Sequence, residues 1–177
     1  MASDAAIAAV ASAVKNLDGP VRMVVHGPGV ATAGGVLTAD TAAVVDAVNI
    51  KVGGMMRLVR AVDTRLVAGS RLVAIGGHYG FEPSAYAATA GVANAALANL
   101  IRQLSWAYGP RHITAHLVAP GPADTNRLHR VASARAERDG STFRADRGGQ
   151  DGQAERGDDR ATDALDGAGD DQLGRGG

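Results

Sequence analysis

Apolar residues follow two different periods along the first 130 residues of this 177-residue chain. From Asp4 to Leu17 they recur every three or four positions, which predicts a helix with one apolar face. The stretch VRMVVHGPG, which starts at Val21, is rich in valine and closes with glycine and proline, as buried strands do. A second helical period starts at a capping residue, Thr38 or Asp40, and continues to about Val67.

The alternation of strand and helix continues up to residue 130. The stretch RLVAIGG, Arg71 to Gly77, predicts a second buried strand, Ser84 to Tyr108 predicts a helix, and HITAHLVAPGP predicts a third strand with a loop. Helix-length crossovers between successive strands require parallel strands and right-handed connections. We therefore expect residues 1–130 to form an α/β fold, a partial Rossmann-like (three-layer) domain with parallel strands and flanking helices.

Ligands of open α/β sheets bind outside the carboxyl ends of the strands. In this chain those ends lead into the loops His26 to Gly29, Gly76 to Tyr79, and Pro120 to Thr125. The candidate site is therefore expected where these loops meet. The histidines of the chain show no ligand pairing in sequence, so we expect no metal site.

The last 47 residues, 131–177, have a different composition. They hold 10 glycines and 18 charged residues but only four large apolar residues, Val131, Phe143, Leu165 and Leu173. Such a segment buries too little apolar surface to offset the entropy of ordering its backbone, so we expect a disordered tail. The tail is a docking arm, an extension without a specific role, or the product of a shifted reading frame.

The charge balance, the apolar runs and the cysteine content bear on the partners and the location expected of this protein. The chain carries 18 Lys and Arg against 18 Asp and Glu, which gives no reason to expect a nucleic-acid partner or an anionic membrane. It has no cysteine, and no stretch reaches the roughly 20 apolar residues that span a bilayer. We therefore expect a cytoplasmic protein without disulfides.

Five motifs in order carry a resemblance to a known family. They are VVHGPG, VDAVNIKVGGMMRL, RLVAIGG, YAATAGVANAAL and VAPGPADT. In this order and spacing the chain, from about Asp4 to Leu128, resembles the second half of the short-chain dehydrogenase/reductase family. The resemblance implies a Rossmann fold and an oxidoreductase that uses NAD or NADP on a carbonyl or alcohol substrate.

The resemblance also implies roles for individual residues. Tyr86 matches the catalytic tyrosine, and Asn49 matches the asparagine that holds a water in the family's proton relay. Gly29 ends the turn after the family's fourth strand. The cofactor's nicotinamide end would meet Pro120, Gly121 and Thr125.

Three departures from the family pattern affect the chemistry. The family stabilises its tyrosine with a lysine four residues on, one helical turn away, and that position is Ala90 here. The family's serine aligns with Gly76 or Gly77. Met1 follows the family's Gly-rich cofactor unit, so the chain looks N-terminally truncated. Tyrosine side chains ordinarily ionise near pH 10 and need a nearby cation to act as a base at neutral pH.

Two functions remain open from the sequence. One is a catalytically impaired oxidoreductase of this family. The other is a non-catalytic remnant, or pseudoenzyme, that associates with a second copy or a full-length relative. By resemblance, the helices over Thr41 to Val67 and Ser84 to Tyr108 form the family's dimer contact, and small residues would allow close approach: Ala87, Ala88, Ala90, Gly91, Ala95 and Ala98.

Overall fold

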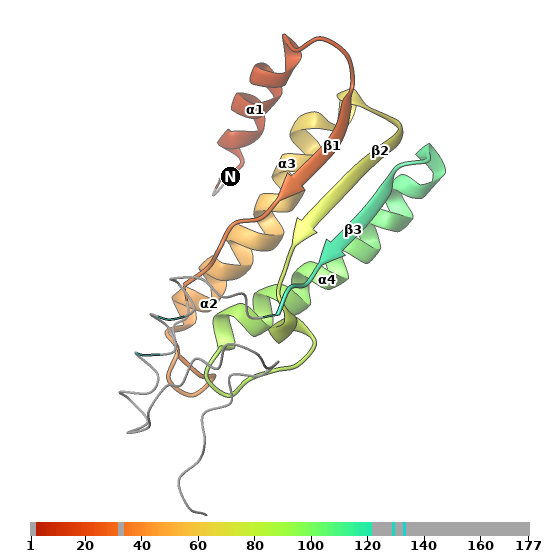
Figure 1. Cartoon of the computed structure of the whole chain (residues 1–177). Coiled ribbons are helices and arrows are strands. Elements are labelled where there is room, and N and C mark those ends of the chain that lie inside the picture. The colour runs from red at the N-terminus through yellow and green to blue at the C-terminus, as the bar shows by residue number, and fades with distance from the viewer. Residues whose placement is uncertain (1–2, 32–33, 122–128, 130–132, 134–177) are drawn as a thin grey trace, which may run out of the picture. The chain divides into compact units, whose positions relative to one another are not determined.

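The computed structural model describes residues 3–31 and 34–121, together with His129 and Ser133 (Figure 1). Residues 1–121 form one compact unit, and residues 122–177 belong to a second. The predictions for Thr125 and, apart from Ser133, for the tail at 131–177 lie outside the described residues.

Within the first unit, three strands form one parallel sheet in the order β1-β2-β3. They are β1 (Val21–His26), β2 (Leu66–Ile75) and β3 (Thr114–Val118). Val24 of β1 pairs with Leu72 of β2, and Val73 of β2 pairs with His116 of β3. The predicted parallel α/β arrangement is confirmed, and the carboxyl ends of all three strands point the same way.

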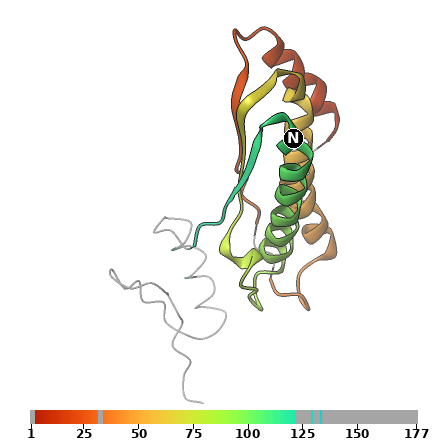
Figure 2. The same ribbon diagram turned by 90° about the vertical axis from the view of Figure 1, so that its right-hand side faces the viewer.

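The described helices cover one face of this sheet (Figure 2). Helix α1 (Ala5–Lys15) packs on α3 (Gly54–Val62), and α4 (Ala88–Tyr108) packs on β3. Their shared core lies between the helices and the sheet: Val24, Met55, Val59, Leu72, Ala74, Leu97 and Ile101 are all buried. The large and unbranched Met55 therefore fills the core and takes no part in the candidate site.

The long helix predicted from residue 38 or 40 to about 67 is wrong in detail. The structure has α2 (Thr41–Val48), one π-helical turn (Asn49–Gly53) and α3, which ends at Val62. Two adjacent glycines, Gly53 and Gly54, adopt the widened turn without side-chain crowding. A 3₁₀ turn then leads directly into β2 at Leu66, so this strand begins earlier than the predicted Arg71.

Helix α4 also begins later than predicted, at Ala88 and not at Ser84. Ala87 forms a parallel bridge with Gly34 from a distant loop. This tertiary contact holds residues 84–87 outside the helix. Tyr86 consequently lies in the turn just before the N-terminus of α4.

No described helix lies on the opposite face of the sheet (Figure 2). Apolar side chains of its strands are exposed. Met23 and Val25 of β1 and Val118 of β3 are about half exposed. Strand β1 is also an edge strand, with one row of backbone groups that has no strand beside it in the described unit.

A cluster of three polar side chains joins the ends of α3 and α4 at the amino edge of the sheet. Asp63 accepts hydrogen bonds from the Tyr108 hydroxyl at 2.8 Å and from Arg111 Nη1 at 2.6 Å. Hydrogen bonds from Arg111 and Tyr108 hold the pKa of Asp63 below its ordinary value of 3.8. Burial, and then the bond to Asp63, raise the pKa of Tyr108 from 10.0 to about 12.

This cluster makes part of the fold's stability sensitive to alkali. Because the pKa of Tyr108 is higher in the folded chain than in the unfolded chain, its contribution is complete below pH 10 and is lost as the pH rises toward 12. Urea unfolding of the wild type and Tyr108→Phe across this window measures the effect. The variant should be less stable by about 1 kcal/mol below pH 10 and should lose less stability with pH. Equal losses in both proteins would contradict this assignment.

Candidate functional site

The loops at the carboxyl ends of the three strands meet, as the topology predicts. The backbone N–H of Gly76, after β2, donates to Val118 O at 2.8 Å, and the N–H of His78 donates to Pro120 O at 3.2 Å. The loop after β1 joins the group through the bridge between Gly34 and Ala87. These three loops form the candidate site.

The loop after β1 holds the segment that carries Tyr86. Ala88 N donates to Gly34 O at 3.0 Å, and Thr89 Oγ1 donates to Ala31 O at 2.8 Å. Gly34 has a φ of +101°, in the left-handed region that favours glycine. A Cβ on Gly35 would overlap the carbonyl oxygen of Ala85. Backbone therefore approaches backbone closely on both sides of Tyr86.

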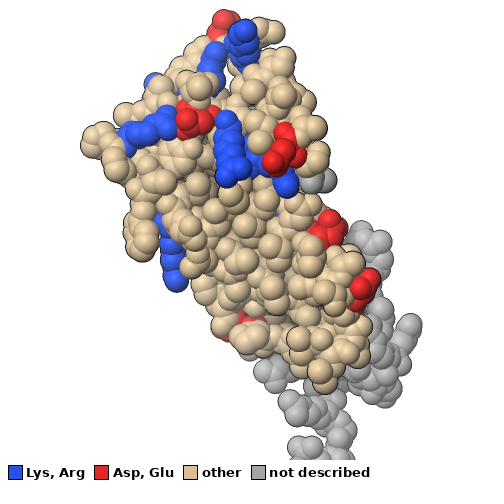
Figure 3. Space-filling view, turned by 180° about the vertical axis from the view of Figure 1, so that it is seen from behind, with Lys and Arg blue, Asp and Glu red and all other residues tan. Residues whose placement is uncertain are grey.

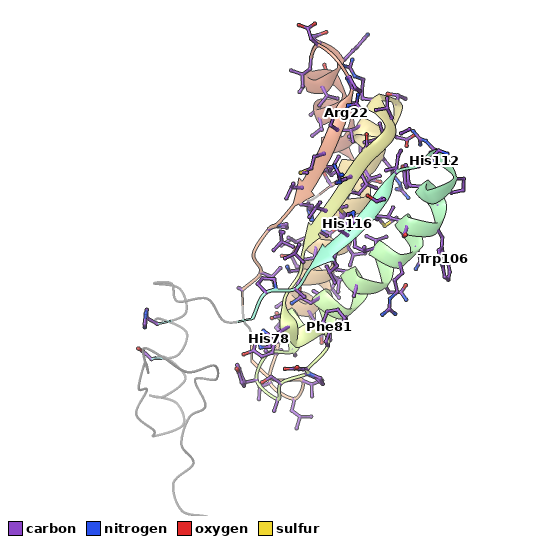
Figure 4. The ribbon with its side chains drawn as sticks, turned by 45° about the vertical axis from the view of Figure 1, so that its right-hand side comes forward. Arg22, His78, Phe81, Trp106, His112 and His116 are labelled. Atoms are coloured by element: carbon purple, nitrogen blue, oxygen red, sulfur yellow. The ribbon has the colours of Figure 1, made fainter. Side chains whose placement is uncertain are left out.

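Tyr86 is paired with a second tyrosine. Its hydroxyl is hydrogen-bonded to the hydroxyl of Tyr79, and their rings meet edge to face with centroids 5.8 Å apart. The ring of His78 lies 3.9 Å from that of Tyr79 (His78 is labelled in Figure 4). Two hydroxyls in contact can donate and accept a proton between them, so the pair can act on a substrate oxygen. The sequence places Tyr79 only at the end of the loop after the second predicted strand and assigns it no role.

The expected stacking of positions 86 and 90 on one helical face is wrong, because Tyr86 precedes α4. Ala90 instead packs in a small apolar cluster with Val30, Ala47 and Ala93. This apolar position offers no cation to the tyrosine pair. At the position where the family has a lysine, this chain therefore has an alanine that packs against apolar residues.

Asn49 begins the π-helical turn and is bound to α3. Its side-chain Oδ1 accepts a hydrogen bond from Arg57 Nη2 at 2.9 Å, while Arg57 Nε pairs with Asp4 at 2.7 Å. A Cβ on Gly53 would lie 2.9 Å from Asn49 Oδ1, so this glycine leaves room for the contact. The amide oxygen of Asn49 therefore serves to join α1, the π turn and α3.

The predicted cofactor-binding positions lie in the gathered loops. Gly29 lies in the loop after β1, and Pro120 and Gly121 follow β3, with Gly121 exposed. A Cβ on Gly121 would meet nothing within 4 Å, so the described fold itself does not require glycine there.

A buried lysine under these loops escaped the sequence analysis. Lys51 is 5% exposed, and its Nζ donates to Ile75 O, at the end of β2, at 3.2 Å. Burial, and then the Lys51 ammonium, lower the pKa of His26 below 6.5, which keeps this residue at the end of β1 neutral at neutral pH. The signal was the spacing of Ala47, Lys51 and Met55, which places the lysine on the buried stripe of its helix.

Asn94 occupies the space into which a side chain at position 77, one of the two positions aligned with the family's serine, would project. The backbone at Gly77 leaves so little room that an added Cβ would sit 2.8 Å from Asn94 Nδ2. The residue is 5% exposed, and its Oδ1 has no hydrogen-bond partner among the described residues. A serine at position 77 would have to displace this amide.

The described part of the chain holds no group of three or more His, Asp or Glu side chains able to bind a metal ion. The search for membrane spans, made over the same residues, found no helix long and apolar enough to cross a bilayer.

Comparison with known proteins gives a family and a fold. A family model described as Enoyl-(Acyl carrier protein) reductase matches residues 1–150. No curated protein sequence matches the chain.

Three solved structures show the shared fold. A short-chain dehydrogenase family protein from Francisella tularensis is 17% identical with a TM-score of 0.70, over 78% of this chain and 57% of its own. An NADH enoyl-[acyl-carrier-protein] reductase from Aquifex aeolicus is 18% identical with a TM-score of 0.66, over 77% and 57%. An NADPH-bound short chain oxidoreductase from Pseudomonas aeruginosa, with an atypical catalytic center, is 16% identical with a TM-score of 0.67, over 78% and 58%. The chain thus spans little more than half the length of these structures.

The close backbone approach at Gly35 should be essential to the site. Gly35→Ala places a methyl group against the carbonyl of Ala85, which neither backbone can avoid without moving. We expect a loss of about 1–3 kcal/mol in the free energy of unfolding, with proteolysis between residues 27 and 40. Denaturant unfolding and limited proteolysis measure both. Gly109→Ala is the matched control, because its backbone is helical and an added Cβ meets no neighbour within 4 Å, and a Gly35→Ala variant as stable as Gly109→Ala would refute the contact.

Proposed function

Because the chain belongs to the short-chain dehydrogenase/reductase family, we propose that it is an impaired oxidoreductase domain that acts on carbonyl or alcohol substrates with NAD or NADP. The observation that supports this proposal is the hydroxyl pair of Tyr86 and Tyr79 at the carboxyl edge of the sheet. In this proposal Tyr86 transfers a proton to or from the substrate oxygen, and Tyr79 orients its hydroxyl.

The chain's own residues fit the reacting end of a nicotinamide cofactor. The loops after β1 and β3 bring Gly29, Pro120 and Gly121 to the edge that holds the tyrosine pair, and Asn94 supplies a buried acceptor that is still open among the described residues. We propose that these loops, with Thr125, hold the nicotinamide end. A bound cofactor would supply hydride chemistry there. Asn49 remains the proposed relay residue.

The proposed impairment has a physical cause at each missing group. Ala90 lies in an apolar cluster and so provides no charge that would favour a phenolate over a phenol. At Gly77 the space for a second hydrogen-bond donor is taken by Asn94. We therefore expect the missing groups to reduce the catalytic rate more than they reduce the affinity for the cofactor.

Calorimetric titration of NADH and NADPH into the folded protein tests the proposal first. Tyr86→Phe should leave cofactor affinity unchanged and lower carbonyl reduction by at least about 100-fold, because the ring stays and the proton donor goes. Tyr108→Phe is the control, since that hydroxyl lies at the amino edge and should leave turnover unchanged. A folded wild type that binds neither nucleotide would refute the oxidoreductase proposal.

A second function, association through the outer helical face, is favoured by a separate observation. Seen from behind, the molecule shows a broad area without charged side chains (Figure 3). Val45 of α2 and Val92 and Trp106 of α4 are exposed, the tryptophan at 81% (Figure 4). Of the small residues expected to permit close approach, Ala87 is buried within the fold and Ala95 is exposed. We propose that this helical face binds a second copy.

Sedimentation velocity of surface variants measures this association. Trp106→Glu should weaken the dimer by at least about 30-fold, because a buried aromatic anchor often contributes 2 kcal/mol or more. Met23→Glu, on the opposite face of the sheet, is the matched control and should leave the dimer intact. If Met23→Glu weakens the dimer and Trp106→Glu does not, the interface lies on the exposed face of the sheet. A monomeric wild type would exclude self-association.

A further inference from the structure

A buried acceptor without a donor lies on α4, covered by the turn from Gly77 to Gly80. Asn94 comes from the buried side of α4, and its side-chain Oδ1 finds no hydrogen-bond partner among the described residues. The other buried polar side chains on this helix and in β2 are satisfied: Thr89 Oγ1 donates to Ala31 O, and Ser70 Oγ donates to Val21 O. Among the described residues only one other buried side-chain atom, His26 Nδ1, also lacks a hydrogen-bond partner.

Such an acceptor costs stability in the folded chain. Leaving a buried polar atom without a partner costs about 1–3 kcal/mol, and a leucine, which has the same branched arrangement of side-chain heavy atoms, would avoid that cost. A buried acceptor that has no hydrogen-bond partner and lowers the stability of the fold is often found at a ligand-binding position.

The surroundings of Asn94 connect it to the tyrosine pair. The turn from Gly77 to Gly80 covers it so closely that an added Cβ on Gly80 would lie 2.8 Å from Asn94 Cβ. Tyr79 belongs to this turn, and its carbonyl oxygen lies over Gly91, one helical turn before Asn94. The turn that covers Asn94 therefore also carries one member of the tyrosine pair, because the Tyr79 hydroxyl is hydrogen-bonded to that of Tyr86.

We propose that Asn94 Oδ1 accepts a hydrogen bond from a hydroxyl or amide N–H of the bound nicotinamide cofactor, after the Gly77–Gly80 turn has moved aside. An amide oxygen only accepts, so the ligand must supply the donor. This assignment rests on the proposed function, because it takes the cofactor as the ligand.

Two measurements on the same variants test the assignment, and neither depends on turnover. Calorimetry with NADH, NADPH and ADP-ribose gives affinity, and thermal denaturation of the free protein gives stability. Asn94→Leu keeps the branched arrangement of side-chain heavy atoms and removes both polar atoms, and Asn94→Ala covers the case in which the bulkier leucine does not fold. Ser70→Ala is the matched control, because it removes a buried polar group that already has partners.

We expect Asn94→Leu to bind the cofactor at least about tenfold more weakly while melting at the same or a higher temperature. Ser70→Ala should melt lower and bind normally. An equal loss for NADH and ADP-ribose would place the donor on the sugar, and a loss for NADH alone would place it on the carboxamide.

Other results would overturn the assignment. If wild type binds and both Asn94 variants bind equally well, Asn94 does not contact the cofactor. If both variants lose stability together with affinity, Asn94 Oδ1 has a structural partner, such as a buried water. If the folded wild type binds none of the three nucleotides, the proposed function fails and the assignment fails with it.

Discussion

The central strand β2 pairs in parallel with both of its neighbours, and the rest of the unit depends on this pairing. Parallel pairing requires a crossover on each side, so the chain must return along α2 and α3 and then along α4. The same pairing directs all three strands toward one edge. The loops that carry Gly29, Tyr79, Tyr86 and Pro120 therefore lie at the same edge. The direction of the strands is enough to bring them there, and no contact between these four residues is required.

The sequence was sufficient to predict the strands, the helices and their parallel arrangement, because these follow from the spacing of apolar residues and from the lengths of the connections. Valine-rich runs became strands, and the three- and four-residue spacing became helices on a parallel sheet. It could not locate the start of α4, because that boundary depends on the bridge between Gly34 and Ala87, which are distant in sequence. Nor could it show that two tyrosines share a hydrogen bond, since this depends on how the Gly77–Gly80 turn packs on α4.

The candidate site sets a polar pair close to an apolar position. The Tyr86 hydroxyl is hydrogen-bonded to that of Tyr79, while Ala90, four residues on, packs with aliphatic side chains. The single lysine of the described loops and helices near this edge, Lys51, is directed instead to the backbone of β2. The tyrosine pair and the described cation nearest this edge are thus carried by different elements, so the two can change independently in this fold.

The uncovered face of the sheet has a thermodynamic consequence for the described unit. Apolar area that is already in water when the chain is folded adds nothing to the heat capacity of unfolding. A sheet that buries only its helical side through Val24, Leu72 and Ala74 thus has a smaller heat-capacity change for its length than one covered on both faces. Its stability curve is correspondingly flat, so that cooling and warming change the fraction folded only gradually around the temperature of maximum stability.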